Sequence, residues 1–183
     1  MPTALPSTKG ILQAKKNLEG ISEITPLKLN QILSDEIGAK VFLKREDLQI
    51  VRSYKIRGAY NFISQLSSAE KKKGVVCASA GNHAQGFAYS CNLLKIKGTV
   101  FMPAPTPKQK VEAVRRVGKQ FIDIVLSGDT YDDAKAAAFK FMHTHNMIFV
   151  PPFDHKLIIE GQGTVGIEIL EQIGKKKIDY LFV

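Results

Sequence analysis

The chain has 183 residues, enough for one domain with a sizeable core or for two small lobes. Its apolar fraction of 44% and charged fraction of 23% are ordinary for a globular protein, and no apolar run approaches the length of a membrane helix, which argues against a membrane protein. The net charge of +9 would suit a nucleic-acid partner, but no aromatic residues interleave with the lysines, which argues against that partner.

The first third of the chain alternates between helix and strand signals. The residues up to about Leu29 contain a helix-like stretch followed by a breaker, Thr25-Pro26-Leu27. The segment from Gln31 to Ile37 is expected to be helical, with Gly38 as its stop. Lys40 to Leu43 is a strand candidate. The start Met1-Pro2-Thr3-Ala4 lacks the charged-then-apolar layout of a signal peptide, so a cytoplasmic location is expected.

A helix predicted to follow Ser53 carries the most informative lysine. Ser53 is a good N-cap residue, which places Lys55 in the first turn, where the helix dipole disfavours positive charge. Arg52 and Arg57 flank Lys55, and like charges also lower the pKa of a lysine. Lys55 is therefore a candidate amine nucleophile, able to form a Schiff base with a carbonyl; the alternative is a solvated lysine in a basic turn. The face that defines this helix consists of Ile56, Ala59, Tyr60, Ile63 and Leu66.

A buried strand and the helix after it follow this lysine. Val75 to Ala78 is predicted to be the strand and Ala84 to Leu94 the helix. The tight link Ser79-Ala80-Gly81-Asn82-His83 joins them, and backbone N–H groups at such a helix start form an anion site. Cys77 and Cys91 lack metal-ligand spacing, so they are expected to be core residues in a reducing compartment.

Short apolar segments and helical segments alternate over the rest of the chain. The expected strands are Gly98 to Met102, Phe121 to Leu126, Met147 to Val150 and Asp179 to Val183. The expected helices are Lys108 to Val117, Asp129 to Thr144 and Gly163 to Ile173. This alternation is typical of βαβ units, so we predict an α/β fold with a parallel twisted sheet flanked by helices.

Three motifs in this order resemble the threonine dehydratase (threonine ammonia-lyase) family. They are Leu43-Lys44-Arg45-Glu46-Asp47-Leu48, Ser53-Tyr54-Lys55-Ile56-Arg57-Gly58-Ala59 and Ser79-Ala80-Gly81-Asn82-His83-Ala84-Gln85-Gly86. The resemblance runs from about Thr25 to the last residue, and the order of several motifs makes it specific. It implies a fold-type-II pyridoxal-phosphate enzyme on a scaffold like that of tryptophan synthase β.

The resemblance also implies a cofactor, a substrate and roles for residues. The cofactor would be pyridoxal 5'-phosphate and the substrate a small amino acid, with L-threonine converted to 2-oxobutanoate and ammonia and L-serine to pyruvate. Lys55 would carry the cofactor and take the substrate Cα proton, Tyr54 would face the cofactor ring, and Asn82 would bond its 3'-hydroxyl. The loop that receives the substrate carboxylate would consist of Ser79, Ala80, Gly81, Asn82 and His83. For His83 itself, an acid/base role and a structural hydrogen bond both stay open.

The family resemblance further divides the chain into lobes. Residues 1–47 and 151–183 would belong to a large lobe, and residues 48–150 would form a small α/β lobe. The chain is expected to stop before the glycine-rich loop that holds the cofactor phosphate, so residues 1–183 alone are expected neither to bind the cofactor tightly nor to catalyse dehydration at a useful rate. A homo-oligomer is expected.

Three other interpretations remain at this point. A serine racemase-like enzyme shares the scaffold, although Ala84-Gln85-Gly86 is more typical of dehydratases. A non-catalytic fragment that acts only in assembly is a second alternative. A nicotinamide-binding protein is suggested by Gly161-x-Gly163-x-x-Gly166, but the strand that this fingerprint requires does not precede it, so we expect these glycines at a close-packed helix start. No metal site is expected, because His143 and His145 do not share a helical face.

Overall fold

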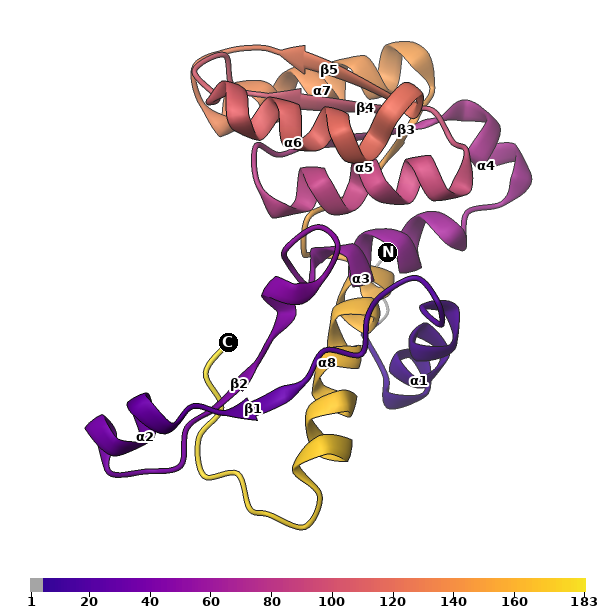
Figure 1. Cartoon of the computed structure of the whole chain (residues 1–183). Coiled ribbons are helices and arrows are strands. Elements are labelled where there is room, and N and C mark those ends of the chain that lie inside the picture. Colours follow the sequence, from indigo (N-terminus) through magenta and orange to yellow (C-terminus); the bar gives the residue numbers. More distant parts are fainter. Residues whose placement is uncertain (1–4) are drawn as a thin grey trace.

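A four-stranded parallel sheet forms one end of the computed structural model, which describes residues 5–183 (Figure 1). Its strands in spatial order are β5 (Ile122–Leu126), β4 (Gly98–Met102), β3 (Val75–Ala78) and β6 (Ile148–Phe149). All three strand pairs are parallel. Every residue of β3 and β4 is buried, as expected for a sheet covered on both faces. The predicted α/β class with a parallel sheet flanked by helices is confirmed.

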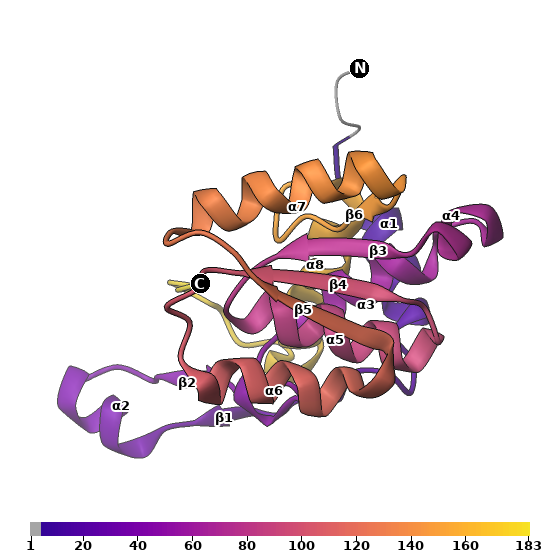
Figure 2. The same cartoon turned by 90° about the horizontal axis from the view of Figure 1, so that it is seen from above.

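Three helices cover this sheet. Helices α5 (Asn82–Leu94) and α6 (Lys108–Gly118) lie on one face, and α7 (Tyr131–His145) lies on the other (Figure 2). The side chains of β3 alternate between them, since Val75 and Cys77 belong to the core on the α5 side and Val76 and Ala78 to the core on the α7 side.

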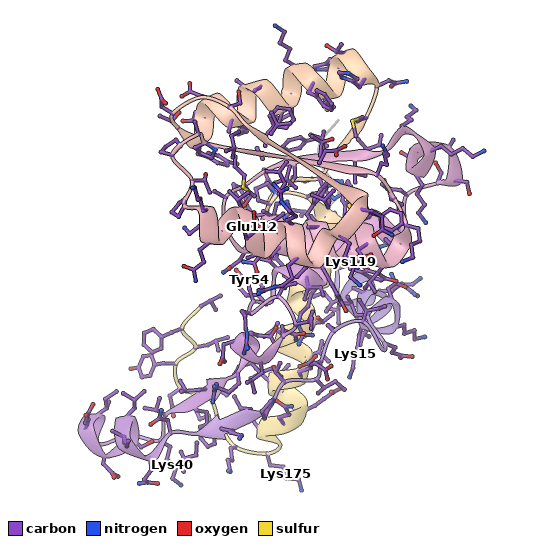
Figure 3. All side chains as sticks on the ribbon, turned by 45° about the horizontal axis from the view of Figure 1, so that its top comes forward. Lys15, Lys40, Tyr54, Glu112, Lys119 and Lys175 are labelled. Atoms are coloured by element: carbon purple, nitrogen blue, oxygen red, sulfur yellow. The ribbon has the colours of Figure 1, made fainter. Side chains whose placement is uncertain are left out.

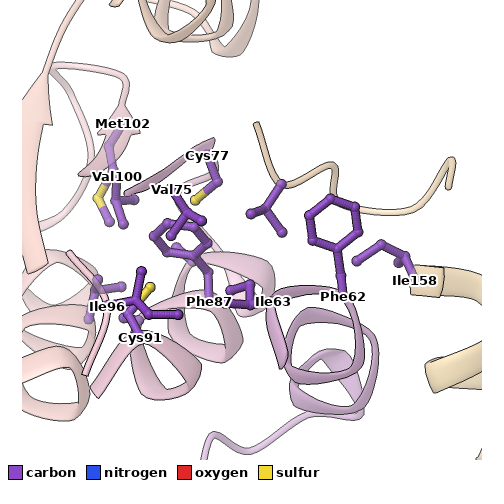
Figure 4. Close-up of a cluster of buried hydrophobic side chains, with 14 of the residues drawn as sticks. Phe62, Ile63, Val75, Cys77, Phe87, Cys91, Ile96, Val100, Met102 and Ile158 are labelled. Atoms are coloured by element: carbon purple, nitrogen blue, oxygen red, sulfur yellow. The ribbon is translucent and has the colours of Figure 1, made fainter. Parts of the chain in front are cut away.

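The larger of the two cores lies between the sheet, α5 and α3. Figure 4 shows Phe87 of α5 among the side chains of β3 and β4, with Phe62 and Ile63 of α3 beside it. Cys77 and Cys91 are buried in this cluster as free thiols, and burial raises both pKa values, that of Cys77 well above its usual range. The two cysteines are core residues, as predicted.

The other end of the molecule consists of helices and a hairpin arm (Figure 1). Helix α3 packs against both α5 and α8, and α1 packs on α8. Strands β1 and β2 pair antiparallel, with α2 at the far end of the arm. The elements here are α1 (Thr8–Asn17), β1 (Leu27–Leu29), α2 (Gln31–Ile37), β2 (Phe42–Lys44), α3 (Lys55–Ser64), α4 (Ser68–Lys73) and α8 (Lys156–Ile173), with 3-10 turns at Glu46–Leu48 and, beside the sheet, at Lys119–Phe121.

Local capping explains several helix ends. Gly38 ends α2 in the left-handed conformation with φ of 70°, which glycine adopts without steric cost. The side chain of Asn30 accepts a hydrogen bond from the Leu33 N–H at the start of α2. Ser67 and Glu70 form a capping box on α4, and the run Lys71–Lys73 is the last turn of this helix, where positive charge suits the dipole.

Two predictions about the last third of the chain are wrong. Helix α8 begins at Lys156 rather than at Gly163, because the His155 side chain accepts a hydrogen bond from the Leu157 N–H and acts as the cap. Residues 179–183 form no strand. Among the described residues no strand pairs with them, and a strand without a neighbour leaves its backbone groups unpaired.

The glycine motif of α8 is therefore inside a helix, not at its start. The backbone of α3 lies directly against Gly161, where an added Cβ would be 2.5 Å from the Arg57 carbonyl oxygen. Gly163 faces Ile11 of α1, and Gly166 has open space around it. Close helix packing explains Gly161, as predicted, but the motif does not follow a strand as a dinucleotide site requires.

Residues 1–4, on which the interpretation of the chain start rests, lie outside the described residues. Within residues 5–183, no helix is long and apolar enough to cross a membrane, and no three His, Cys, Asp or Glu side chains gather as a metal site would need. The lysines labelled in Figure 3, namely Lys15, Lys40, Lys119 and Lys175, are spread over the molecule.

Candidate functional site

The strand order creates a topological switch point at the carboxyl edge of the sheet. After β3 the chain crosses through α5 to β4 on one side, and β6 joins β3 on the other side through α7. The helices on the two sides of this point lie on opposite faces of the sheet (Figure 2). In open parallel sheets, ligands bind outside the carboxyl ends of the strands at such a switch point. The topology alone therefore marks the carboxyl ends of β3 and β6 as the candidate site.

Lys55 reaches this edge from the first residue of α3. Its Nζ donates a hydrogen bond of 2.8 Å to the carbonyl of Pro152, which lies just beyond β6. The same Nζ is 5.4 Å from the centre of the Tyr54 ring. The Lys55 backbone N–H donates to Ser53 Oγ at 3.2 Å, so Ser53 serves this helix start, although Tyr54 is the formal cap. Lys55 is thus held at the carboxyl edge of the sheet, half-buried.

Burial lowers the pKa of the Lys55 amine below its usual range. The predicted direction is confirmed, but the predicted contribution of the flanking arginines is wrong. Desolvation accounts for the shift, and neither Arg52 nor Arg57 contributes. Arg57 lies on another side of α3, with its guanidinium fully buried and paired to Glu46 and Glu168.

The loop after β3 lies at the same edge. Ser79 Oγ accepts a hydrogen bond from the Gly81 N–H at 3.2 Å, and Ala80 is half-buried between them. Helix α5 then begins at Asn82 with no side-chain cap on its first turn. An added Cβ on Gly81 would meet nothing within 4 Å, and Asn82 is exposed. The loop therefore offers an uncapped helix start with free space beside it, which suits an anion.

His83 is buried in the first turn of α5. Its Nε2 lies 3.1 Å from the Val150 carbonyl, and its buried Nδ1 has no hydrogen-bond partner among residues 5–183. Burial lowers the pKa of His83 to about 4, so the ring is neutral near pH 7. The carbonyl can only accept, so the proton of the neutral ring is on Nε2 and Nδ1 is a free acceptor. The structural hydrogen bond considered for His83 is present, and its Nδ1 is an acceptor still to be used.

A close helix contact brings the loop and the lysine together. An added Cβ on Gly86 of α5 would lie 2.9 Å from the Ile56 nitrogen and 3.0 Å from the Lys55 carbonyl. Only glycine allows the two helices to approach so closely. The close contact of α3 and α5 therefore brings Lys55 and the segment Ser79–His83 together, as predicted.

The contribution of the chain after β6 was missed. Val150 and Pro152 supply carbonyl acceptors to His83 and Lys55. The available signal was the pair Pro151-Pro152 directly after an apolar strand, to which no contact with the site was assigned.

Comparison with known proteins adds independent information. Residues 19–183 match the model of the family described as pyridoxal-phosphate dependent enzyme. The chain is 51% identical over 172 residues to the biosynthetic L-threonine dehydratase IlvA of Halalkalibacterium halodurans; the match covers 94% of this chain and 41% of that protein. The chain therefore spans about two fifths of that relative's length.

Solved structures agree in fold. The processed form of threonine deaminase isoform 2 from Solanum lycopersicum superposes with a TM-score of 0.82 at 39% identity, covering 93% of this chain and 48% of that one. Maize serine racemase superposes with a TM-score of 0.87 at 30% identity, covering 93% and 51%.

Proposed function

Because the chain belongs to the pyridoxal-phosphate dependent enzyme family, we propose that it supplies the amine-bearing part of an active site that dehydrates and deaminates L-threonine to 2-oxobutanoate and ammonia, with L-serine giving pyruvate. The family membership confirms the resemblance drawn from its motifs. The observation that carries the proposal is the Lys55 amine, held at the switch point of the sheet beside an uncapped helix start. The identity to a threonine dehydratase favours threonine as the substrate.

The residues at this edge fit pyridoxal 5'-phosphate. The cofactor requires a nucleophilic amine, and desolvation keeps more of Lys55 in the neutral form than in water. It also carries ring substituents that hydrogen-bond, and the edge offers the exposed Asn82 and the unpartnered Nδ1 of the buried His83. When bound, the cofactor supplies an electron sink for a carbanion at the substrate Cα.

Each predicted site residue has a proposed part in the reaction. Lys55 Nζ would hold the cofactor and would take the proton from the substrate Cα. Tyr54 and Asn82 would help to hold the cofactor, Tyr54 through its ring and Asn82 through its side-chain amide. The loop from Ser79 to His83 receives the substrate carboxylate, which the uncapped start of α5 favours electrostatically. The Ser79 N–H already donates to the Phe101 carbonyl and the Gly81 N–H to Ser79 Oγ, so the donors for the carboxylate are the N–H groups of Ala80, Asn82 and His83.

The position of the Lys55 amine is compatible with this role. The one hydrogen bond that it forms within the described part of the chain is to the Pro152 carbonyl, a neutral acceptor that an amine can leave at a small net cost of about 1 kcal/mol. No carboxylate within the described residues forms an ion pair with Lys55. The amine is therefore free to become neutral and to move.

A serine racemase activity is the second candidate, because maize serine racemase superposes over 93% of the chain. The two reactions share removal of the Cα proton and differ in the step after it. Racemisation returns a proton to the opposite face of Cα, whereas dehydration expels the β-hydroxyl. Their products, D-serine and a 2-oxo acid, separate the two candidates.

We also propose that the protein forms a homo-oligomer and acts in the cytoplasm. Large apolar side chains are exposed on the hairpin arm and on α8, namely Ile32, Ile37, Ile159 and Leu170. Burial of these side chains against a second copy of the chain would favour association. Light scattering coupled to size-exclusion chromatography would measure the mass, and a monomer at micromolar concentration would exclude the oligomer.

The central experiment uses the purified protein expressed from its natural gene. Lys55→Ala is expected to lower 2-oxobutanoate formation at least about 10³-fold, since both attachment and proton transfer are lost. The matched control is Lys72→Ala, an exposed lysine of α4, which should keep full activity. Borohydride reduction followed by peptide mapping should recover the cofactor on Lys55. Recovery on another lysine would overturn the assignment, and D-serine without a 2-oxo acid would favour the racemase.

A further inference from the structure

Helix α3 carries a second buried charge besides the reactive amine. Arg57 is 1% exposed and lies two residues after Lys55. Its guanidinium contacts Glu46 through Nε at 2.9 Å and Nη2 at 2.8 Å, and Glu168 of α8 through Nη1 at 2.6 Å and Nη2 at 3.1 Å. Lys44 of β2 completes the group with a contact of 2.5 Å to Glu168. These four side chains, Lys44, Glu46, Arg57 and Glu168, are called the charge cluster below.

Every member of the charge cluster is satisfied. Arg57 also donates to Thr164 Oγ at 3.1 Å and to the Glu23 carbonyl at 3.1 Å. Glu46 accepts from the Thr25 hydroxyl at 2.5 Å, and Lys44 donates to the Thr25 carbonyl. Burial opposes the charge on Arg57, but the hydrogen bonds with Glu46 and Glu168 outweigh it, so the pKa of Arg57 lies above its ordinary value. Two positive and two negative charges leave the cluster neutral.

The charge cluster connects α3 to segments distant in the chain. Residues 23–25 and 44–49 precede α3, while Glu168 is 111 positions after Arg57. Two residues along a helix correspond to a rotation of about 200°, so Lys55 and Arg57 point to nearly opposite sides. The Lys55 amine therefore faces the sheet edge only while α3 keeps its rotation about the helix axis and its position along that axis. The contacts of the Arg57 guanidinium determine both.

Charged contacts suit this task better than apolar packing. A planar guanidinium that bonds two carboxylates in a fork fixes direction as well as distance. Apolar side chains of similar volume often give equal or greater stability, but they specify geometry less sharply. The backbone contacts of Gly58 with α8 and of Gly86 with α3 leave little room on either side. A small rotation of α3 would take Lys55 away from Pro152.

We propose that Arg57 is a positioning residue for Lys55: its paired contacts with Glu46 and Glu168 fix the first turn of α3 and hold the Lys55 amine against the Pro152 carbonyl. The inference rests on the proposed function only in taking Lys55 as the reacting amine. Arg57 touches neither the sheet edge nor the substrate loop through any hydrogen bond of the described residues. It acts through the helix.

The pH at which Lys55 titrates reports the placement of its amine. The amine contacts the Pro152 carbonyl after β6 and the ring of Tyr54, and the titratable group whose charge couples to it is His83 of α5. Desolvation at this position holds the pKa of Lys55 below its usual range. An amine that leaves the position returns towards the ordinary lysine pKa, and each unit of that rise lowers the neutral fraction tenfold at a fixed pH.

The test is competitive labelling of the cofactor-free full chain with acetic anhydride between pH 7 and 11, with each lysine quantified by peptide mass spectrometry. The main variant is Arg57→Met with Glu168→Gln, which removes one charge of each sign and so keeps the cluster neutral. Arg57→Lys keeps the positive charge and loses the planar guanidinium that bonds two carboxylates at once. Arg45→Met is the control, because it removes an arginine whose ion pair, with Asp47, lies at the surface.

In the unaltered chain and in the Arg45 control, Lys55 should titrate below the ordinary range of lysine. In the double variant Lys55 should titrate within that range, so that its labelling at pH 8 falls several-fold relative to that of the exposed Lys72, and Arg57→Lys should give an intermediate value. Circular dichroism selects the folded variants, and Arg57→Lys decides the matter if the double variant does not fold. An unchanged titration of Lys55 in a folded variant would overturn the proposal. Labelling involves neither cofactor nor substrate, so failure of the proposed reaction is seen separately, in the 2-oxobutanoate assay.

Discussion

Two positive side chains two residues apart on helix α3 have opposite surroundings. Arg57 has six hydrogen bonds and two carboxylate partners, whereas Lys55 has one bond, to a neutral carbonyl. Nearby His83 keeps a buried nitrogen without a partner, and Asn82 is exposed. The members of the charge cluster all have hydrogen-bond partners, whereas polar groups at the sheet edge remain without one among the described residues.

This difference separates stability from chemistry within one helix. A saturated buried charge is costly to disturb and has nothing left to offer a ligand. An unsaturated polar group stabilises the fold less, but it can bond a ligand that arrives. We therefore expect changes in the charge cluster to lower the free energy of unfolding as well as displace Lys55, and changes at the sheet edge to affect mainly turnover near pH 7.

The largest effect on unfolding is expected for Glu168→Gln. It leaves the buried Lys44 and Arg57 with an excess positive charge, so the free energy of unfolding should fall by about 3–5 kcal/mol. Urea denaturation would measure the loss. Asp47→Asn, which breaks the exposed pair with Arg45, should change little, because solvent screens that pair. Equal losses in the two variants would remove the contrast between buried and exposed pairs.

Asn82→Ala should lower turnover and leave the free energy of unfolding nearly unchanged. Loss of a positioned contact to the cofactor is expected to reduce turnover by about two to three orders of magnitude. The side chain is exposed and forms no hydrogen bond within the described residues, so urea denaturation should show little change in stability. Steady-state kinetics and the visible spectrum of the loaded protein are the measurements. Normal kinetics with a normal spectrum would leave Asn82 a helix-start residue only.

Burial of the neutral His83 ring should make the free energy of unfolding depend on pH. The unfolded chain binds a proton at His83 near pH 6.5, whereas the folded chain does so only near pH 4. Between these values the unfolded state holds more protons, so stability falls as the pH falls from 6.5 to 4, by about 3 kcal/mol in total. His83→Gln should remove this part of the dependence in urea titrations at several pH values. His145→Gln, at an exposed histidine, is the control and should leave it intact.

The smallest effects are expected for glycines on the two sides of α3. Gly86→Ala and Gly161→Ala push a Cβ against the backbone of Lys55–Ile56 and of Arg57–Gly58, at a cost of about 1–3 kcal/mol each. Gly166→Ala meets open space in the same helix as Gly161 and should stabilise by up to about 1 kcal/mol through helix propensity. Thermal or urea unfolding compares the three. A stabilising Gly161→Ala would contradict the close crossing of α3 and α8.

The strands at the centre of the sheet were the most predictable elements. Val75–Ala78 and Gly98–Met102 have the predicted bounds, because a strand buried on both faces is a continuous apolar run with sharp ends. The antiparallel β1 was missed, because Pro26 beside it was taken as a breaker. Residues 179–183 have the same apolar character as the central strands, yet they are exposed and unpaired. An apolar run determines a strand only where another strand lies beside it.

The candidate site was predictable to a similar extent. The position of Lys55 in a first turn and the polar loop from Ser79 to His83 follow from local order along the chain. The lobe boundaries at residues 48 and 150 remain predictions. So do the roles of the site residues, which the variants above test.

The sequence by itself determined the α/β class, the family and the two short segments that meet at the sheet edge, since periodicity, caps and motif order are local properties. Only the tertiary structure decided which way each charge of α3 points and what meets it. The partners of Arg57 and Lys55 are 111 and 97 positions away, and no local pattern specifies a contact over that distance. The physical reason is that hydrogen-bond satisfaction of a buried charge depends on all the elements packed around it, and these come together only when the chain folds.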